Sequence, residues 1–145
     1  AQFRGRVRAG VSIVGISDFH SFLENTAEYR RDLRRAEYGD ERDPSMAAFL
    51  RRITPLSRAQ HITAPMFIVH GANDPRVPAA QAEKLFSVLK AQGTQPWLMI
   101  ATDEGHGFNK KENIIALDAA VTLFLRQVVP GQGGAERISP PGAYQ

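Results

Sequence analysis

The sequence predicts an α/β domain whose mostly parallel sheet is flanked by helices. Three short apolar runs have the length of strands: residues 10–15, 65–70 and 96–101. Helical patterns lie between these runs and after the last of them. Strands that alternate with helices at this spacing are typical of βαβ units, in which neighbouring strands run parallel.

The first strand has a glycine at each end, and residues 16–25 follow it without a clear helical pattern. We expect a loop there. Its apolar members are Phe19, Phe22 and Leu23. Residues 26–38 are rich in charged side chains and predict a helix that ends at Gly39.

A further helix is expected to begin at Asp43-Pro44, where an N-cap carboxylate precedes a proline in the first turn. Pro55 would end this helix, because proline interrupts helical hydrogen bonding. Apolar residues recur between these two points at helical spacing: Met46, Phe49, Leu50 and Ile53.

The second strand is apolar at consecutive positions, as in strands that are covered on both faces. The next helix opens at Pro78 and closes at Gly93. Its apolar stripe is Ala82, Leu85, Phe86 and Leu89. The third strand follows, over residues 96–101.

The last helix is expected to begin with a capping pair, Asn109 and Glu112. We expect it to bury Leu117, Ala120, Val121, Phe124, Leu125 and Val128. From residue 130 onward the chain consists mainly of glycine, proline and polar residues. The sequence therefore predicts one folded unit over residues 1–129 and a disordered tail over residues 130–145.

Composition excludes several classes of protein. The 145 residues suffice for one domain or part of one, and 43% hydrophobic and 23% charged residues are typical of a globular chain. The absence of cysteine excludes disulfides and thiolate sites and leaves the compartment open, with a slight preference for the cytoplasm. No apolar run approaches the roughly 18 residues of a membrane helix. No metal or cofactor is expected, because histidine and carboxylate residues show no ligand spacing.

A net charge of +3 and two groups of arginines raise the possibility of a nucleic-acid surface. The first group lies within residues 4–8 and the second within residues 30–35. Acidic residues are interleaved with the second group, which is the pattern of a solvated helix face. We therefore expect no nucleic-acid partner.

Two loops carry the residue types of acid–base chemistry. Asp74 lies in the segment HGANDPRVP, residues 70–78, and His106 lies in DEGHGF, residues 103–108. Each loop follows a strand, so the two side chains can meet at the carboxyl edge of a parallel sheet. A carboxylate there would fix the tautomer of an imidazole that takes a proton from a hydroxyl.

The other titratable residues of these loops are interpreted as solvated or structural residues and not as catalytic groups. Asp103 and Glu104 are alternative acids near His106, but we interpret them as solvated loop charges. His70 stands at a strand end, where histidine is usually structural.

The two loops together resemble the C-terminal part of the prolyl oligopeptidase family of serine peptidases, in its acylaminoacyl-peptidase and dipeptidyl-peptidase-like branches. The resemblance runs from about residue 3 to residue 129 and implies the C-terminal portion of an α/β-hydrolase fold. By position it implies that Asp74 and His106 are the acid and histidine of a Ser-Asp-His triad. It also implies that Arg76 binds a substrate carbonyl, and that Phe19 and Phe22 line a specificity pocket.

The family's serine lies in a Gly-x-Ser-x-Gly turn that this chain does not contain. Ser17, in the segment GISDF, follows a strand but lacks the second glycine, so we do not expect it to be a nucleophile. We therefore expect a fragment of a serine peptidase that carries only the acid and the histidine and is inactive alone. Another α/β-hydrolase, such as an esterase, and a non-catalytic interaction domain are the alternatives.

The expected partners follow from the same interpretation. A peptide would be the substrate of the complete enzyme. A three-stranded parallel sheet would leave an apolar edge unpaired, so we expect self-association or association with another chain through that edge.

Overall fold

A three-stranded parallel sheet forms the centre of the molecule. The computed structural model describes residues 6–129. The strands are β1 (Gly10–Ile13), β2 (Met66–Gly71) and β3 (Trp97–Ala101), in the spatial order β1-β2-β3. Both pairings are parallel, with Val11 opposite Phe67 and Phe67 opposite Trp97. The predicted α/β class and the predicted strands are confirmed, with bounds shifted by one or two residues.

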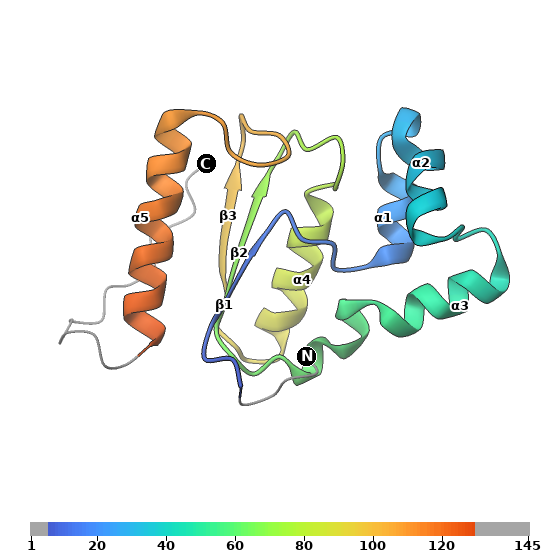
Figure 1. Cartoon of the computed structure of the whole chain (residues 1–145). Coiled ribbons are helices and arrows are strands. Elements are labelled where there is room, and N and C mark those ends of the chain that lie inside the picture. The colour runs from blue at the N-terminus through green and yellow to red at the C-terminus, as the bar shows by residue number, and fades with distance from the viewer. Residues whose placement is uncertain (1–5, 130–145) are drawn as a thin grey trace.

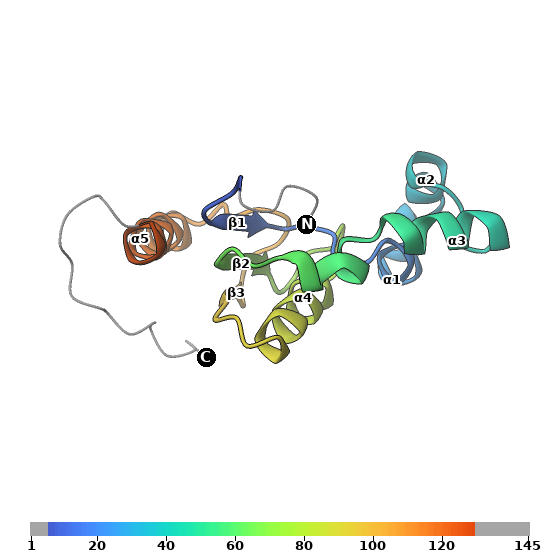
Figure 2. The same ribbon diagram turned by 90° about the horizontal axis from the view of Figure 1, so that it is seen from below.

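One helix covers each face of the sheet (Figures 1 and 2). Helix α5 (Lys111–Val128) packs against Phe67 and Val69 of β2 through the fully buried ring of Phe124. Helix α4 (Ala80–Ala91) packs against Ile68, on the opposite face of the same strand. Because side chains alternate along a strand, the consecutive apolar residues of β2 serve both cores.

The chain between β1 and β2 folds into four helical segments, the first three of which extend beyond α4 (Figure 2). They are α1 (Phe19–Asn25), α2 (Glu28–Tyr38), α3 (Pro44–Ile53) and the 3₁₀ helix η1 (Pro55–His61). Helix α3 begins as predicted, since Asp43 accepts hydrogen bonds from the backbone N–H groups of Ser45 and Met46.

The prediction of a loop over residues 16–25 is wrong, because α1 occupies residues 19–25. Asp18 caps this helix by accepting from the His20 N–H at 3.2 Å. Phe19, Phe22 and Leu23 have i, i+3, i+4 spacing, and Phe22 and Leu23 pack into a core cluster with Leu50 of α3. The capping residue Asp18 and the apolar stripe are both visible in the sequence, but the stripe extends only over residues 19–23.

Gln81 of α4 joins the helical insertion to the sheet domain. Its buried amide oxygen accepts from the backbone N–H groups of Ser17 and Asp18, at 3.1 and 2.8 Å. Its amide nitrogen donates to the hydroxyl of Ser21 at 3.0 Å. Buried polar groups satisfied in this way fix relative position more specifically than apolar contact does.

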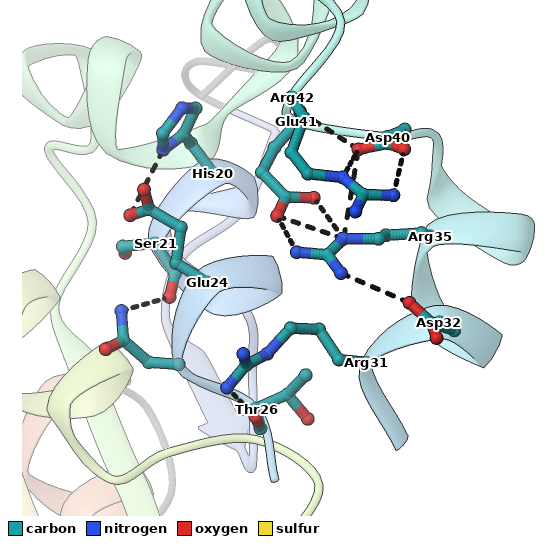
Figure 3. Close-up of polar contacts among 11 residues, drawn as sticks. His20, Ser21, Glu24, Thr26, Arg31, Asp32, Arg35, Asp40, Glu41 and Arg42 are labelled. Carbon is teal, nitrogen blue, oxygen red and sulfur yellow. Dashed lines mark hydrogen bonds and ion pairs between the residues drawn. The ribbon is translucent and has the colours of Figure 1, made fainter. Parts of the chain in front are cut away.

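Two arginines of α2, Arg31 and Arg35, have polar partners within the insertion, as Figure 3 shows. The guanidinium of Arg35 donates to Glu41 through Nε at 3.1 Å and to Asp32 through Nη1 at 3.2 Å. This hydrogen bonding lowers the pKa of the Glu41 carboxyl below its ordinary value. Arg42 forms a separate pair with Asp40. Such internal pairing favours the interpretation of α2 as a solvated helix over a nucleic-acid surface.

Helix α5 differs in two details from its prediction. Of the six residues predicted to be buried, only Phe124 is fully buried. Its cluster holds four more that are partly buried, Leu117, Ala120, Val121 and Val128, whereas Leu125 is 39% exposed. Asn109 and Glu112 do not form a cap, and the helix begins after Lys110 without a side-chain cap of its own. The predicted tail over residues 130–145 lies outside the described residues. No helix among the described residues is long and apolar enough to span a membrane.

Candidate active site

The loops after β2 and β3 meet at the carboxyl edge of the sheet, at the top of Figure 1. Backbone hydrogen bonds join them: the Ala72 N–H donates to the Ala101 carbonyl, and the Asn73 N–H donates to the Glu104 carbonyl, each at 2.9 Å. The Asn73 amide also donates to the Thr102 carbonyl at 2.8 Å. Parallel neighbouring strands bring the loops together, and these bonds hold them there.

Gly71 allows this close approach. A Cβ atom at this position would overlap the backbone carbonyl of Gly105 and crowd that of Glu104. The β3 loop therefore lies directly against the end of β2, which only a residue without a side chain permits.

The carboxylate of Asp74 is fully buried and accepts hydrogen bonds at both oxygens. Oδ1 accepts from the backbone N–H groups of Arg76 at 2.8 Å and Val77 at 3.0 Å. Oδ2 lies 2.8 Å from Nδ1 of His106 and 3.3 Å from Nε2 of His70. Burial alone would raise the pKa of Asp74, but these hydrogen bonds outweigh it and lower the pKa to about 2.

The orientation of His106 follows from this carboxylate. An ionised carboxylate can only accept, so Nδ1 of His106 carries the proton and Nε2 is left for another partner. A short backbone bridge between Gly105 and Gly107 encloses His106, and Gly107 has a positive φ of 88°. The imidazole is 30% exposed, so it is reachable from solvent while one of its nitrogens is held.

Glu104 is buried, so its interpretation as a solvated charge is wrong. Its carboxylate accepts from the backbone N–H groups of Asn109 at 3.1 Å and Lys110 at 2.8 Å, and from the amide of Asn113 at 2.9 Å. These bonds lower its pKa, the Asn113 bond most. Glu104 thus satisfies N–H groups at the start of α5, the role predicted for Asn109 and Glu112. Asp103 is exposed, as expected, and pairs with Lys110 at 2.6 Å.

The proposed substrate-binding residues have different surroundings. The backbone of Arg76 is fixed, since its carbonyl accepts from the Thr26 hydroxyl at 2.8 Å. Its side chain is exposed, and within residues 6–129 the guanidinium forms no ion pair. Phe19 is partly buried and its ring lies 5.8 Å from that of Tyr38. Phe22 is 1% exposed, so it offers no surface to a substrate in this structure.

Two further residues are informative. Ser17 is buried and its hydroxyl donates to the Gln81 carbonyl at 2.7 Å, which explains it as a structural residue. Thr26 is buried against the Asp74 loop and was not singled out by the sequence, where a threonine at the border of a predicted loop and a predicted helix gives no signal. No group of His, Asp and Glu residues within the described part of the chain could hold a metal ion.

The fold and the site define a class of protein. A parallel sheet covered by helices, with an aspartate–histidine pair at its carboxyl edge, is typical of the α/β-hydrolases. Residues 2–132 match the model of the prolyl oligopeptidase family, and the chain belongs to that family.

Two curated relatives support the assignment. The chain is 33% identical over 126 residues to dipeptidyl aminopeptidase BIII of Pseudoxanthomonas mexicana, across 85% of this chain. It is 32% identical over 139 residues to dipeptidyl peptidase family member 6 of Caenorhabditis elegans, across 93% of this chain. The chain spans only 18% of the length of either relative.

Solved structures match the same part of the fold. A puromycin-hydrolyzing peptidase of Mycobacterium tuberculosis aligns with a TM-score of 0.75 and 27% identity, over 86% of this chain and 19% of that one. The acylaminoacyl peptidase of Pyrococcus horikoshii aligns with a TM-score of 0.74 and 22% identity, over 91% of this chain and 22% of that one. The second match shows a shared fold. Both cover a minor part of the known chains.

Proposed function

We propose that this chain is the part of a serine peptidase catalytic domain that carries the acid and the histidine of a Ser-Asp-His triad. The observation that supports the proposal most directly is the 2.8 Å contact between His106 Nδ1 and Asp74 Oδ2. Membership of a peptidase family makes acyl transfer from a peptide bond the reaction to expect.

The chemistry follows from the orientation of the ring. His106 Nε2 takes the proton of a serine hydroxyl as the oxygen attacks the peptide carbonyl, and later gives it to the leaving amine. Asp74 stabilises the imidazolium formed in between. Its depressed pKa keeps it ionised throughout the range in which His106 works. The carboxylate is thus a permanent acceptor.

The serine is proposed to lie outside this chain. Among the described residues, no serine hydroxyl hydrogen bonds to His106. A fluorophosphonate probe, which labels an activated serine, should therefore leave the purified chain unmodified. Labelling of Ser17, or of any other serine of the chain, would contradict this part of the proposal.

A protein that joins this chain to the serine-bearing segment tests the roles of the pair. Asp74→Asn should lower kcat by about 10⁴, because the amide would favour the wrong tautomer of His106. The measurement is hydrolysis of a peptidyl anilide beside an ester of the same acyl group. Activity on the ester alone would identify an esterase, and full activity of Asp74→Asn would reject the triad.

Arg76 is proposed to bind a peptide carbonyl, because its guanidinium is unpaired within residues 6–129 and its backbone is fixed. In the same complete protein, Arg76→Gln should raise KM about tenfold or more with a smaller effect on kcat, as expected for a lost charged hydrogen bond. Arg126→Gln on α5 is the control and should behave as wild type. Equal KM values for both variants would reject the assignment.

A further inference from the structure

We propose that His70 is a positioning residue for the Asp74–His106 pair, through an Nε2–H group that bridges the Val77 carbonyl and the Asp74 carboxylate. The inference rests on the proposed function of that pair and adds a second histidine to it. His70 stands near the end of β2, and its side chain is completely buried.

The geometry places His70 on the same carboxylate oxygen that His106 uses. His70 Nε2 lies 2.8 Å from the Val77 carbonyl oxygen and 3.3 Å from Asp74 Oδ2. A histidine that only filled space at a strand end would need neither neighbour. Here the Nε2 atom of His70 faces both the Asp74 carboxylate and the Val77 carbonyl. This contact connects the two ends of the loop of residues 70–77.

The tautomer of His70 follows from its two nitrogens. A carbonyl and a carboxylate can only accept, so Nε2 must carry the proton. Nδ1 is buried without a hydrogen-bond partner. A buried lone pair without a donor costs less than a buried N–H without an acceptor, which favours the same tautomer. His70 and His106 therefore present protons from opposite ring nitrogens, Nε2 and Nδ1, to one oxygen.

The consequence is a carboxylate whose plane is fixed. A carboxylate is planar, so a rotation about the Cβ–Cγ bond would move both oxygens together, and the two backbone N–H groups oppose this rotation at Oδ1 only. At Oδ2 the His106 ring is 30% exposed, whereas the His70 side chain on β2 is completely buried. His70 therefore opposes the rotation at Oδ2 from inside the fold and helps to set the direction in which His106 is held.

The test measures the protonation sites of the imidazoles by ¹⁵N NMR of histidine-labelled chain, above the titration range of histidine. In the wild type, the proton should reside on Nε2 of His70 and on Nδ1 of His106. His70→Gln places an amide N–H near the position of Nε2 and should keep His106 in its Nδ1–H form. His70→Asn is one bond too short and should lose most of that form.

The controls separate positioning from folding. Both variants are expected to be less stable than wild type, so a fall in the unfolding midpoint alone decides nothing about position. His61→Gln, on η1 away from the loops, should leave the His106 signals unchanged. If His70→Asn does not fold, the wild-type spectrum still tests the proposal, because a proton on Nδ1 of His70 would overturn it.

The remaining outcomes are distinct. If folded His70→Asn and His70→Gln both keep the Nδ1–H form of His106, or both lose it, the side-chain donor is not what matters and the proposal is overturned. If wild-type His106 itself lacks the Nδ1–H form, the pair on which the proposed function rests is wrong, and the inference falls with it.

Discussion

The carboxylate of Asp74 is fully buried, which distinguishes Asp74 from the other aspartates of the chain. Asp32, for example, is almost fully exposed beside Arg35. Enclosure alone would favour the neutral acid, yet four donors on two oxygens reverse the balance. Buried carboxylates that several hydrogen-bond donors keep ionised are more typical of functional sites than of ion pairs on the protein surface.

This enclosure predicts an acid-sensitive component of stability. Hydrogen bonding to His70, Val77, His106 and Arg76 outweighs burial and lowers the Asp74 pKa from its ordinary 3.8 to about 2. The folded pKa lies below the unfolded one, so the stabilisation is complete above pH 3.8 and is lost as the pH falls toward 2. The contribution is about 2 kcal/mol. Asp74→Asn should flatten the dependence of unfolding free energy on pH across this window.

Urea unfolding at a series of pH values measures this effect. Asp118→Asn, an exposed aspartate of α5, is the matched control and should keep the wild-type slope. A slope for Asp74→Asn as steep as that of wild type would show that the carboxylate is not held as described.

At the scale of elements, the start of α5 depends on a residue that precedes the helix by several positions. Glu104 accepts from two backbone N–H groups there and from the Asn113 amide. Glu104→Ala should lower Tm by about 5 °C or more, because it leaves these donors without their acceptor. Differential scanning calorimetry of the chain measures the shift.

Glu112→Ala provides the comparison, since the sequence pattern assigned the capping role to Glu112 and the structure leaves it exposed. Its Tm should lie within about 1–2 °C of wild type, as for most surface substitutions. If Glu112→Ala were the more damaging change, the capping pair expected from the sequence would be correct after all.

The close contact of Gly71 with the backbone of the β3 loop leads to a further prediction. Gly71→Ala would push a methyl group into the backbone of residues 104–105. Backbone cannot yield as a flexible side chain can, so we expect a loss of about 3 kcal/mol or more and displacement of His106 from Asp74. The unfolding midpoint and the ¹⁵N signals of His106 report these two effects.

Gly93→Ala is the matched substitution after α4. A Cβ atom at Gly93 meets nothing within 4 Å, but the backbone has a positive φ of 81°. It should cost about 1 kcal/mol from conformational strain alone and leave His106 unaffected. Equal costs at the two glycines would contradict the close approach at Gly71.

Strand β2 was predictable from its continuous apolar run, and helix α4 from an apolar stripe that extends over several turns. Helix α1 was missed because seven residues give a weak period. The contact of Asp74 with His106 followed from strand topology. The burial of Glu104 and the bridge at His70 could not be predicted, since both depend on how closely two loops approach.

At the scale of the whole molecule, the Asp74 loop is held from two directions. Backbone bonds tie it to the β3 loop, and the Thr26 hydroxyl ties the Arg76 carbonyl to the helical insertion. The insertion is itself fastened to α4 by Gln81. The pair of side chains is thus supported by the β3 loop, the helical insertion and α4.

The sheet has two edges within residues 6–129, because β1 and β3 each pair with β2 alone. At the β1 edge, Ile13 at the end of the strand is 46% exposed. The N–H groups of Gly10 and Val14 point toward β2, so by alternation those of Val11 and Ile13 point outward. Unpaired, outward N–H groups beside an exposed apolar side chain form a template for another strand. We therefore predict that the isolated chain associates in a concentration-dependent way.

Size-exclusion chromatography with light scattering over a dilution series measures this association. Ile13→Lys should shift the chain toward monomer, because a lysine at an edge must lose its hydration when a second strand pairs. Ile115→Lys adds the same charge at a comparably exposed isoleucine of α5, away from the edge, and should not change the distribution. A wild-type chain that stays monomeric at every concentration would exclude association, and an equal effect of both lysines would attribute it to charge rather than to the edge of β1.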